Sequence, residues 1–194
     1  RAQLSPCAAA LTFEGYSQTF AQFGERIRRV AGMLRDGGVC QGDRVGYIGL
    51  NHPCFLETLY ACGCIGAIFV PLNFRLTGSE VRFIANDAGI QTMMADANFI
   101  ALIDDEKDHL HCRRYISIEN EADGWERLET LLSDREPLNL LEHVSEDDID
   151  FCISSNLLST CFIIAACEVV CVSVITFMLP TICCWLVDKS LNTS

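Results

Sequence analysis

Short apolar runs alternate with amphipathic stretches between Arg44 and Ile118, and this alternation constrains the fold more than any other feature of the sequence. The apolar runs have the length of buried strands, whereas the stretches between them carry apolar side chains at three- and four-residue spacings. Strands that alternate with helices over short connectors are typical of right-handed βαβ units around a parallel sheet. We therefore predict an α/β fold: a doubly wound, mostly parallel sheet with flanking helices.

The same patterns assign most of the sequence up to residue 132 to strands and helices. The predicted strands are 10–13, 16–18, 44–50, 67–70, 90–95 and 115–118. The predicted helices are 20–36, 52–65, 78–87, 97–103 and 125–132, followed by a polar connector at 133–150. We expect Thr19 to cap the first helix and Gly37 to end it. The pattern Thr77-Gly-Ser-Glu80 predicts a capping box at the start of the third helix. Asn51 is expected to cap the second helix, with Pro53 in its first turn. We expect Pro71 to end the strand predicted at 67–70.

The charge distribution argues against nucleic acid as a partner. Almost all of the formal net charge of −12 falls before Phe151, and Lys107 and Lys189 are the only lysines. An acidic domain of this kind repels phosphate backbones at long range, so we predict no nucleic-acid partner. We place the basic cluster of Arg26, Arg28 and Arg29 on the solvated face of the first long helix.

The cysteines do not have the pattern of a disulfide framework or of a metal site. None of the twelve has C-x-x-C spacing. Cys62-Gly-Cys64 is too closely spaced for a zinc knuckle, and no histidine pair at metal spacing accompanies it. No secretory signal opens the chain. We therefore predict that the cysteines before Phe151 are small buried hydrophobic residues in a reducing compartment, and we assign no metal ligand.

The order of several short motifs resembles one known family. The motifs are Leu11-Thr12-Phe13, Gly42-Asp43-Arg44-Val45, Asn51-His-Pro-Cys-Phe-Leu-Glu57, Gly66-Ala67 and Val70-Pro-Leu-Asn-Phe-Arg-Leu-Thr77. In this order they resemble the N-terminal part of the adenylate-forming, AMP-binding superfamily and, within it, the fatty-acyl-CoA synthetases. The resemblance covers about residues 4–150, and we take 1–150 as the N-terminal part of an AMP-dependent synthetase/ligase domain.

The resemblance implies ATP-dependent activation of a fatty or other carboxylic acid. In that reaction the carboxylate attacks the α-phosphate of ATP to give an acyl-adenylate and pyrophosphate, and coenzyme A then displaces AMP. The implied cofactors are ATP, Mg²⁺ and CoA, and the implied partner is a small-molecule carboxylic acid. We assign the matched positions Asn51, Asn73 and Arg75 to packing or capping. No residue is assigned to catalysis, cofactor binding or metal binding, and no oligomeric state is assigned.

The family's phosphate loop, rich in glycine, serine and threonine and containing a lysine, should follow an Asp-Asp-x-Ala strand. Here Asp147-Asp148 begins that approach, but residues 152–160 contain neither glycine nor lysine. Without glycine, a backbone does not readily adopt the positive φ values and the close approach that phosphate binding requires. From the resemblance we therefore expect a truncated ligase that is inactive alone and binds none of the family's cofactors well.

The residues from 151 to 194 form an apolar, cysteine-rich tail with Glu168 as the only charged residue before Asp188. Residues 157–179 satisfy the length rule for a membrane helix, although a carboxylate near the centre is costly there. Three interpretations stay open: a C-terminal membrane anchor, a buried segment of a rearranged domain, or non-family sequence joined by intron read-through, frameshift or a mispredicted exon. The alternative function is therefore a non-enzymatic, tail-anchored membrane protein with an α/β interaction domain. The predicted location is cytoplasmic, with membrane association through 157–179 under the anchor interpretation.

Overall fold

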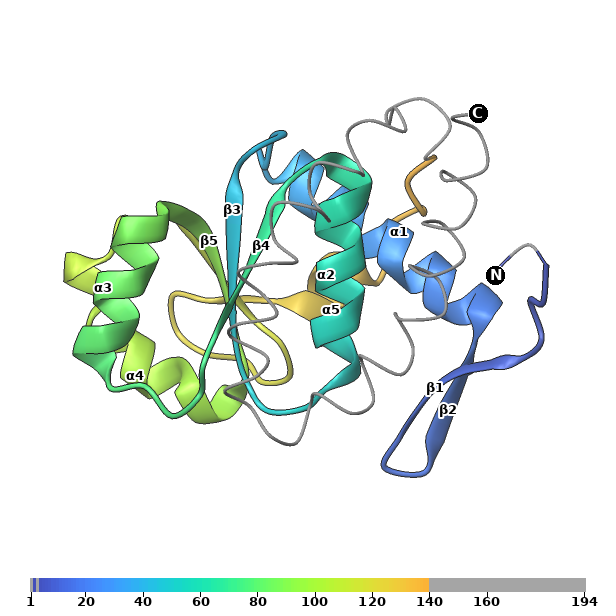
Figure 1. Cartoon of the computed structure of the whole chain (residues 1–194), viewed down its shortest axis with the longest axis horizontal. Helices are drawn as coiled ribbons and strands as arrows, with labels where there is room; N and C mark the ends of the chain where they lie inside the picture. The colour runs from blue at the N-terminus through green and yellow to red at the C-terminus, as the bar shows by residue number, and fades with distance from the viewer. Residues whose placement is uncertain (1, 3, 140–194) are drawn as a thin grey trace, which may run out of the picture. The chain divides into compact units, whose positions relative to one another are not determined.

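The computed structural model describes residues 2 and 4–139 (Figure 1). The described residues all belong to one compact unit. The predictions for residues 151–194, including the proposed membrane helix at 157–179, lie outside the described residues. Among residues 2 and 4–139, no helix is both long enough and apolar enough to cross a bilayer.

A five-stranded parallel sheet organises the described part of the chain. In spatial order its strands are β4 (Ile68–Leu72), β3 (Arg44–Ile48), β5 (Ile90–Ala95), β6 (Arg114–Ser117) and β7 (Glu126–Arg127). Every neighbouring pair in this order is parallel. A separate antiparallel hairpin of β1 (Ala9–Phe13) and β2 (Tyr16–Thr19) precedes the sheet. The prediction of an α/β fold with a mostly parallel sheet is therefore confirmed.

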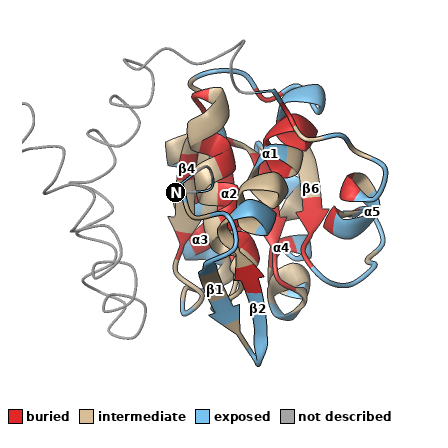
Figure 2. Cartoon of the chain, turned by 90° about the vertical axis from the view of Figure 1, so that its right-hand side faces the viewer, coloured by how far each residue is buried: buried red, intermediate tan, exposed pale blue. Residues whose placement is uncertain are grey.

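Helices cover both faces of the sheet, as Figure 1 shows. The helices on one face are α1 (Phe20–Asp36), α2 (Pro53–Ile65) and α5 (Leu128–Leu132). The helices on the other face are α3 (Gly78–Ala88) and α4 (Ile100–Asp104). Side chains along β3 alternate between the two cores, with Val45 and Tyr47 in the first and Ile48 in the second. This period of two is the geometry of a strand that is buried on both faces. Figure 2 shows the buried residues on these strands and on the helix surfaces that face them, whereas the hairpin is largely exposed.

Hydrogen bonds at the helix starts confirm two predicted caps and correct a third. The capping box at Thr19 is formed, since Gln22 N donates to Thr19 Oγ1 at 3.3 Å and Thr19 N donates to Gln22 Oε1 at 2.9 Å. The predicted box at the start of α3 is also formed. For α2, the predicted cap Asn51 is wrong: His52 is the N-cap, and its Nδ1 accepts from Cys54 N at 3.1 Å. Proline occupies the first helical position, so the capping residue is the one directly before it.

Two other predicted boundaries are wrong for reasons of strand pairing. Pro71 does not end its strand but lies within β4, opposite Tyr47. Since β4 is an edge strand, proline removes no hydrogen bond that the sheet needs there. The helix predicted at 125–132 begins only at Leu128, because Glu126 and Arg127 pair with β6 as a short strand.

The prediction for the cysteines holds at some positions and fails at others. Cys54 and Cys62 are buried, as expected for small hydrophobic residues on the inner face of α2. Cys7 and Cys40 are exposed, and here the prediction is wrong. Both lie in turns that precede strands, where no helix or sheet face covers the side chain.

The placement of Arg26 on a solvated helix face is also wrong. Its side chain is 25% exposed and lies between two carboxylates from other helices. Arg26 Nε donates to Glu57 Oε2 at 3.0 Å, and its Nη1 donates to Glu129 Oε2 at 2.9 Å. The Glu57 side chain is only 2% exposed. Arg26 therefore joins α1 to α2 and α5, whereas Arg28 is exposed as predicted.

Candidate functional site

The connections of the sheet single out one edge as a place where ligands bind. From β3 the chain passes through α2 to β4 on one side, and then through α3 to β5 on the other side of β3. In open α/β sheets, ligands bind outside the carboxyl ends of the strands at such a reversal of strand order. We call the segments that follow these strands the carboxyl edge. They are 49–52, 73–75, 96–99 and 118–120.

The three family-matched positions of the sequence lie on this carboxyl edge. Asn51 follows β3, and Asn73 and Arg75 follow β4, whose last residue pairs in register with that of β3. Asn73 Oδ1 accepts a hydrogen bond from Arg75 N at 2.9 Å, which closes a turn. The Arg75 guanidinium lies 5.6 Å from the centre of the Phe74 ring. The structure thus brings together motifs that are separated by more than twenty positions in the sequence.

Asp96 joins the carboxyl ends of β3 and β5 through hydrogen bonds, and the sequence analysis did not identify it. Its Oδ2 accepts from Leu50 N at 3.4 Å, and its Oδ1 accepts from Asn98 N at 2.9 Å. Its own N–H donates to Ile48 O at 3.0 Å. Gly49 permits this approach, because a Cβ there would lie 3.0 Å from Asp96 Cβ. An aspartate directly after the apolar run of β5 was the available signal.

His52 and Glu119 are two titratable residues of the carboxyl edge that lie close to each other. His52 Nε2 lies 3.8 Å from Glu119 Oε1, while His52 Nδ1 accepts the hydrogen bond that caps α2. In neutral His52, the proton therefore resides on Nε2, and no ring nitrogen is left to accept a proton from a substrate. This pair is arranged to position the start of α2 rather than to act as a general base.

The nearby thiol and phenol are also unsuited to chemistry. Burial raises the pKa of the Cys54 thiol to about 12, so this cysteine is a neutral thiol near pH 7. Burial likewise raises the pKa of Tyr47, whose hydroxyl has no hydrogen-bond partner among the described residues. The described carboxyl edge is therefore a scaffold without an activated nucleophile.

The described residues do not by themselves fit a complex of ATP with Mg²⁺. No group of three or more His, Cys, Asp or Glu side chains between residues 4 and 139 is placed to hold a metal ion. The backbone N–H groups of Leu50 and Asn98 already donate to Asp96, so they are not available for a phosphate. The described part of this edge therefore offers no free backbone donor at Leu50 or Asn98 for a nucleotide phosphate.

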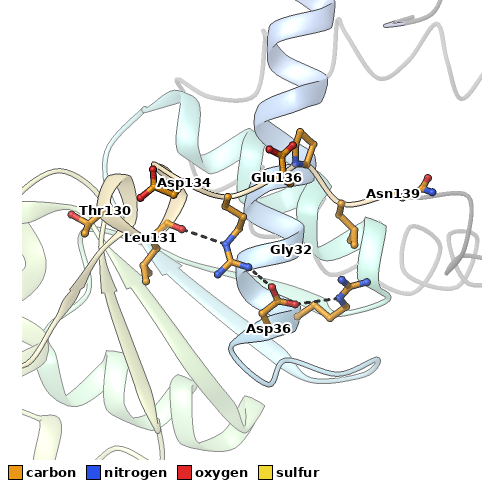
Figure 3. Close-up of a pocket in the computed structure, with 11 residues that line it drawn as sticks. Gly32, Asp36, Thr130, Leu131, Asp134, Glu136 and Asn139 are labelled. Atoms are coloured by element: carbon orange, nitrogen blue, oxygen red, sulfur yellow. Dashed lines mark hydrogen bonds and ion pairs between the residues drawn. The ribbon is translucent and has the colours of Figure 1, made fainter.

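A hollow lies at the C-terminal end of α1 (Figure 3). It has a volume of about 560 Å³ and is bounded by the second half of α1 and by residues 130–139. Arg135 crosses it, donating from Nε to Leu131 O at 3.3 Å and pairing with Asp36. Arg35 also pairs with Asp36, at 3.6 Å. Both arginines of this hollow are paired with the same carboxylate, and we assign it no ligand.

Comparison with known proteins identifies the family. The profile of the family described as AMP-binding enzyme matches residues 1–153. This chain therefore belongs to the AMP-binding enzyme family. Its relatives include a feruloyl-CoA synthase from Amycolatopsis sp., which is 48% identical over 94 residues, or 48% of this chain and 19% of that protein. An indoleacetate–CoA ligase from Aromatoleum aromaticum is 34% identical over 131 residues, or 68% of this chain and 26% of that protein.

Solved structures of ligases share the fold. A fatty acyl CoA synthetase from Mycobacterium tuberculosis superposes with a TM-score of 0.63 at 28% identity, covering 70% of this chain and 27% of that one. A benzoate CoA ligase from Burkholderia xenovorans has a TM-score of 0.64 at 18% identity, covering 71% and 27%. The second likeness, at that identity, concerns the fold alone. The chain spans about a fifth to a quarter of the length of the curated relatives described above.

Proposed function

We propose that residues 1–150 are the front part of the AMP-binding domain of an acyl- or aryl-CoA ligase. The reaction is the ATP-dependent activation of a carboxylic acid through an acyl-adenylate to an acyl-CoA. The observation that carries this proposal is the family match over residues 1–153. The names of two relatives, feruloyl-CoA synthase and indoleacetate–CoA ligase, support an aromatic carboxylic acid as the substrate, and that of the fatty acyl CoA synthetase from Mycobacterium tuberculosis supports a fatty acid.

In this proposal the carboxyl edge is the surface on which the rest of the domain builds its nucleotide site. Polar groups of this edge form hydrogen bonds with one another, and Asp96 joins the carboxyl ends of β3 and β5. The edge nevertheless presents exposed side chains, including Asn51, Arg75 and Leu50, the last of which is 47% exposed. An apolar side chain beside polar ones at a strand reversal supports contact with a further segment of protein.

We further propose that the chain as given does not form an acyl-adenylate. Residues 152–160 offer no glycine and no lysine at the position of the family's phosphate loop, and the family match ends at residue 153. These two observations support the interpretation of 151–194 as non-family sequence. ATP, Mg²⁺ and CoA are then cofactors of the family that this chain binds poorly. The described residues offer no support for the alternative of a membrane-anchored interaction protein.

The test is acid-dependent release of pyrophosphate by the full chain with ATP and Mg²⁺. Ferulate, indoleacetate and a long-chain fatty acid are supplied in turn, and a complete feruloyl-CoA synthase serves as the control. We expect no release above that of the reaction without acid. Release that requires one of the acids would overturn the proposal of inactivity and would identify the substrate class at the same time.

A further inference from the structure

Two histidines flank one buried residue on the segment that leads into β6. His109 and His111 are exposed, whereas Leu110 between them is only 8% exposed and belongs to the core under α3 and α4. Strand β6 runs parallel to β5, so the residues before it lie at the edge of the sheet opposite to the carboxyl edge. The two histidines are therefore separate from the surface assigned to the ligase.

The backbone of this segment directs the two histidines to one side. Leu110 is extended, with φ −89° and ψ 142°. Asn86 of α3 holds this conformation, since its Nδ2 donates to His109 O at 2.8 Å and its Oδ1 accepts from His111 N at 3.0 Å. In an extended segment, alternate side chains point to the same side, and their Cα atoms are about 6.5 Å apart. Because Leu110 points into the core, the histidines on either side of it both point outward.

The imidazole rings of both histidines are available to a ligand. Neither ring has a hydrogen bond or an ion pair with another residue between 4 and 139, where their contacts are made by the backbone. His52 differs from them, because its Nδ1 is used to cap α2. Neutral imidazole has one free nitrogen lone pair and is a suitable ligand for Ni²⁺, Cu²⁺ and Zn²⁺. Two such rings on alternate residues can reach one ion, at about 2.1 Å from each nitrogen.

The charges near the two histidines favour a cation. Asp108 directly precedes His109, and Asp87 directly follows Asn86 in α3; both aspartates are exposed. Arg113 is the only cationic residue of the segment 108–113. Among the described residues, neither aspartate completes a set of three side-chain ligands. Two nitrogen ligands with water in the other positions suit the tetragonal coordination of Ni²⁺ and Cu²⁺.

We propose that His109 and His111 together bind one divalent transition-metal ion of the Ni²⁺ and Cu²⁺ kind. The two imidazole nitrogens are the protein ligands, and Asn86 positions them by fixing the backbone between them. The Mg²⁺ of the family reaction is not the ion of this site, because Mg²⁺ prefers oxygen ligands. The site uses neither the carboxyl edge nor the cofactors of the family, so it stands or falls independently of the ligase assignment.

The test follows the imidazole C–H signals of the isotope-labelled full chain during titration with Ni²⁺ at neutral pH. The paramagnetic ion broadens the signals of the groups that bind it. We expect the signals of His109 and His111 to broaden together and before that of His52, whereas Mg²⁺ leaves them unchanged. Broadening that begins at His52, or at the exposed Cys7 or Cys40, would contradict the proposal.

Three variants decide whether the two rings bind one ion together. His109→Gln and His111→Gln each leave one imidazole, and each is expected to weaken Ni²⁺ binding about tenfold. The matched control His111→Gln/Arg113→His keeps the number of histidines but places the second ring about 13 Å along an extended chain from the first. It is expected to bind as weakly as His111→Gln, although it also removes a positive charge.

All three substitutions replace exposed side chains, so the unfolding midpoints should stay close to that of the unchanged chain. Undiminished Ni²⁺ binding to either single variant would overturn the proposal. Binding of the matched control as tight as that of the unchanged chain would do so too, as would the absence of broadening at both histidines.

Discussion

The two faces of the sheet are stabilised in different ways. The core under α3 and α4 consists of apolar side chains, among them Val81, Ile90 and Ile103. The face under α1, α2 and α5 also has an apolar core, but a buried carboxylate, Glu57, lies beside it and is paired with Arg26. An apolar face depends on filled volume, whereas a face with a buried charge depends on its partner being present. The α1 face is therefore specified by pairing between distant parts of the chain, as between Arg26 and Glu129.

The largest expected effect comes from removing the partner of the buried carboxylate. Arg26→Met leaves Glu57 buried without its cation, and we expect a loss of about 4 kcal/mol in the free energy of unfolding. Denaturant unfolding of the variant and of the unchanged chain measures this. The double variant Arg26→Met/Glu57→Leu removes both charges and is expected to recover most of the loss. A cost below about 1 kcal/mol for the single variant would show that the charge pair does not distinguish this face.

The opposite face should respond to volume alone. Ile103 is fully buried on α4, and Ile103→Ala is expected to cost about 3 kcal/mol, while Ile103→Val costs about 1 kcal/mol. The same denaturant unfolding experiment provides both values. Equal costs for the two variants would contradict the view that filled volume stabilises this face.

The helix caps should be equivalent on the two faces, because a cap acts locally. Thr19 caps α1 and Thr77 caps α3, both in capping boxes with a side chain three residues later. Thr19→Ala and Thr77→Ala are each expected to cost about 1 kcal/mol of unfolding free energy. If the costs of the two variants differ by more than about 1 kcal/mol, a cap also contributes to the packing of its face.

The smallest expected effect is on the acid side of the stability profile. Hydrogen bonding to Arg26 lowers the pKa of Glu129, and hydrogen bonding to Arg114 lowers the pKa of Glu126, both from 4.5. A carboxyl group with a lowered pKa in the folded state contributes stability above its unfolded value, and this is lost as the pH falls through the folded value. Stability should therefore decrease below about pH 4.5.

Glu129→Gln should make that decrease shallower, because it removes one carboxyl group whose protonation is linked to unfolding. Urea midpoints between pH 3 and pH 7 measure it, with Glu14→Gln on the exposed hairpin as the matched control. An unchanged slope for Glu129→Gln would show that Glu129 does not contribute to the pH dependence of the α1 face.

Local signals explain which parts of the fold the sequence predicted. The helix from Phe20, the box at Thr77 and the strand at Ile90–Ala95 follow from periodicity and capping, and the structure contains all three. Boundaries set by strand pairing were missed, as at Pro71 and Leu128, because they depend on neighbours that are distant in sequence.

The polar contacts of the α1 face were missed for the same reason. Arg26 and Glu129 are 103 positions apart, and nothing in either local sequence links them. Asp96 is a similar case, because its role depends on Leu50 in another loop. Sequence therefore provided the family and the elements, but not the contacts that hold the elements together.

A chimera of residues 1–150 of this chain with the remaining part of the Amycolatopsis feruloyl-CoA synthase tests whether these residues can serve as the front part of an active ligase. The measurement is ferulate-dependent release of AMP in the presence of ATP, Mg²⁺ and CoA. A second chimera, in which the lysine of the donor's phosphate loop is changed to alanine, is the control. If residues 1–150 are the front part of an AMP-binding domain, the chimera releases AMP, while the control and the present chain do not. A chimera that folds cooperatively yet releases no AMP would contradict the claim.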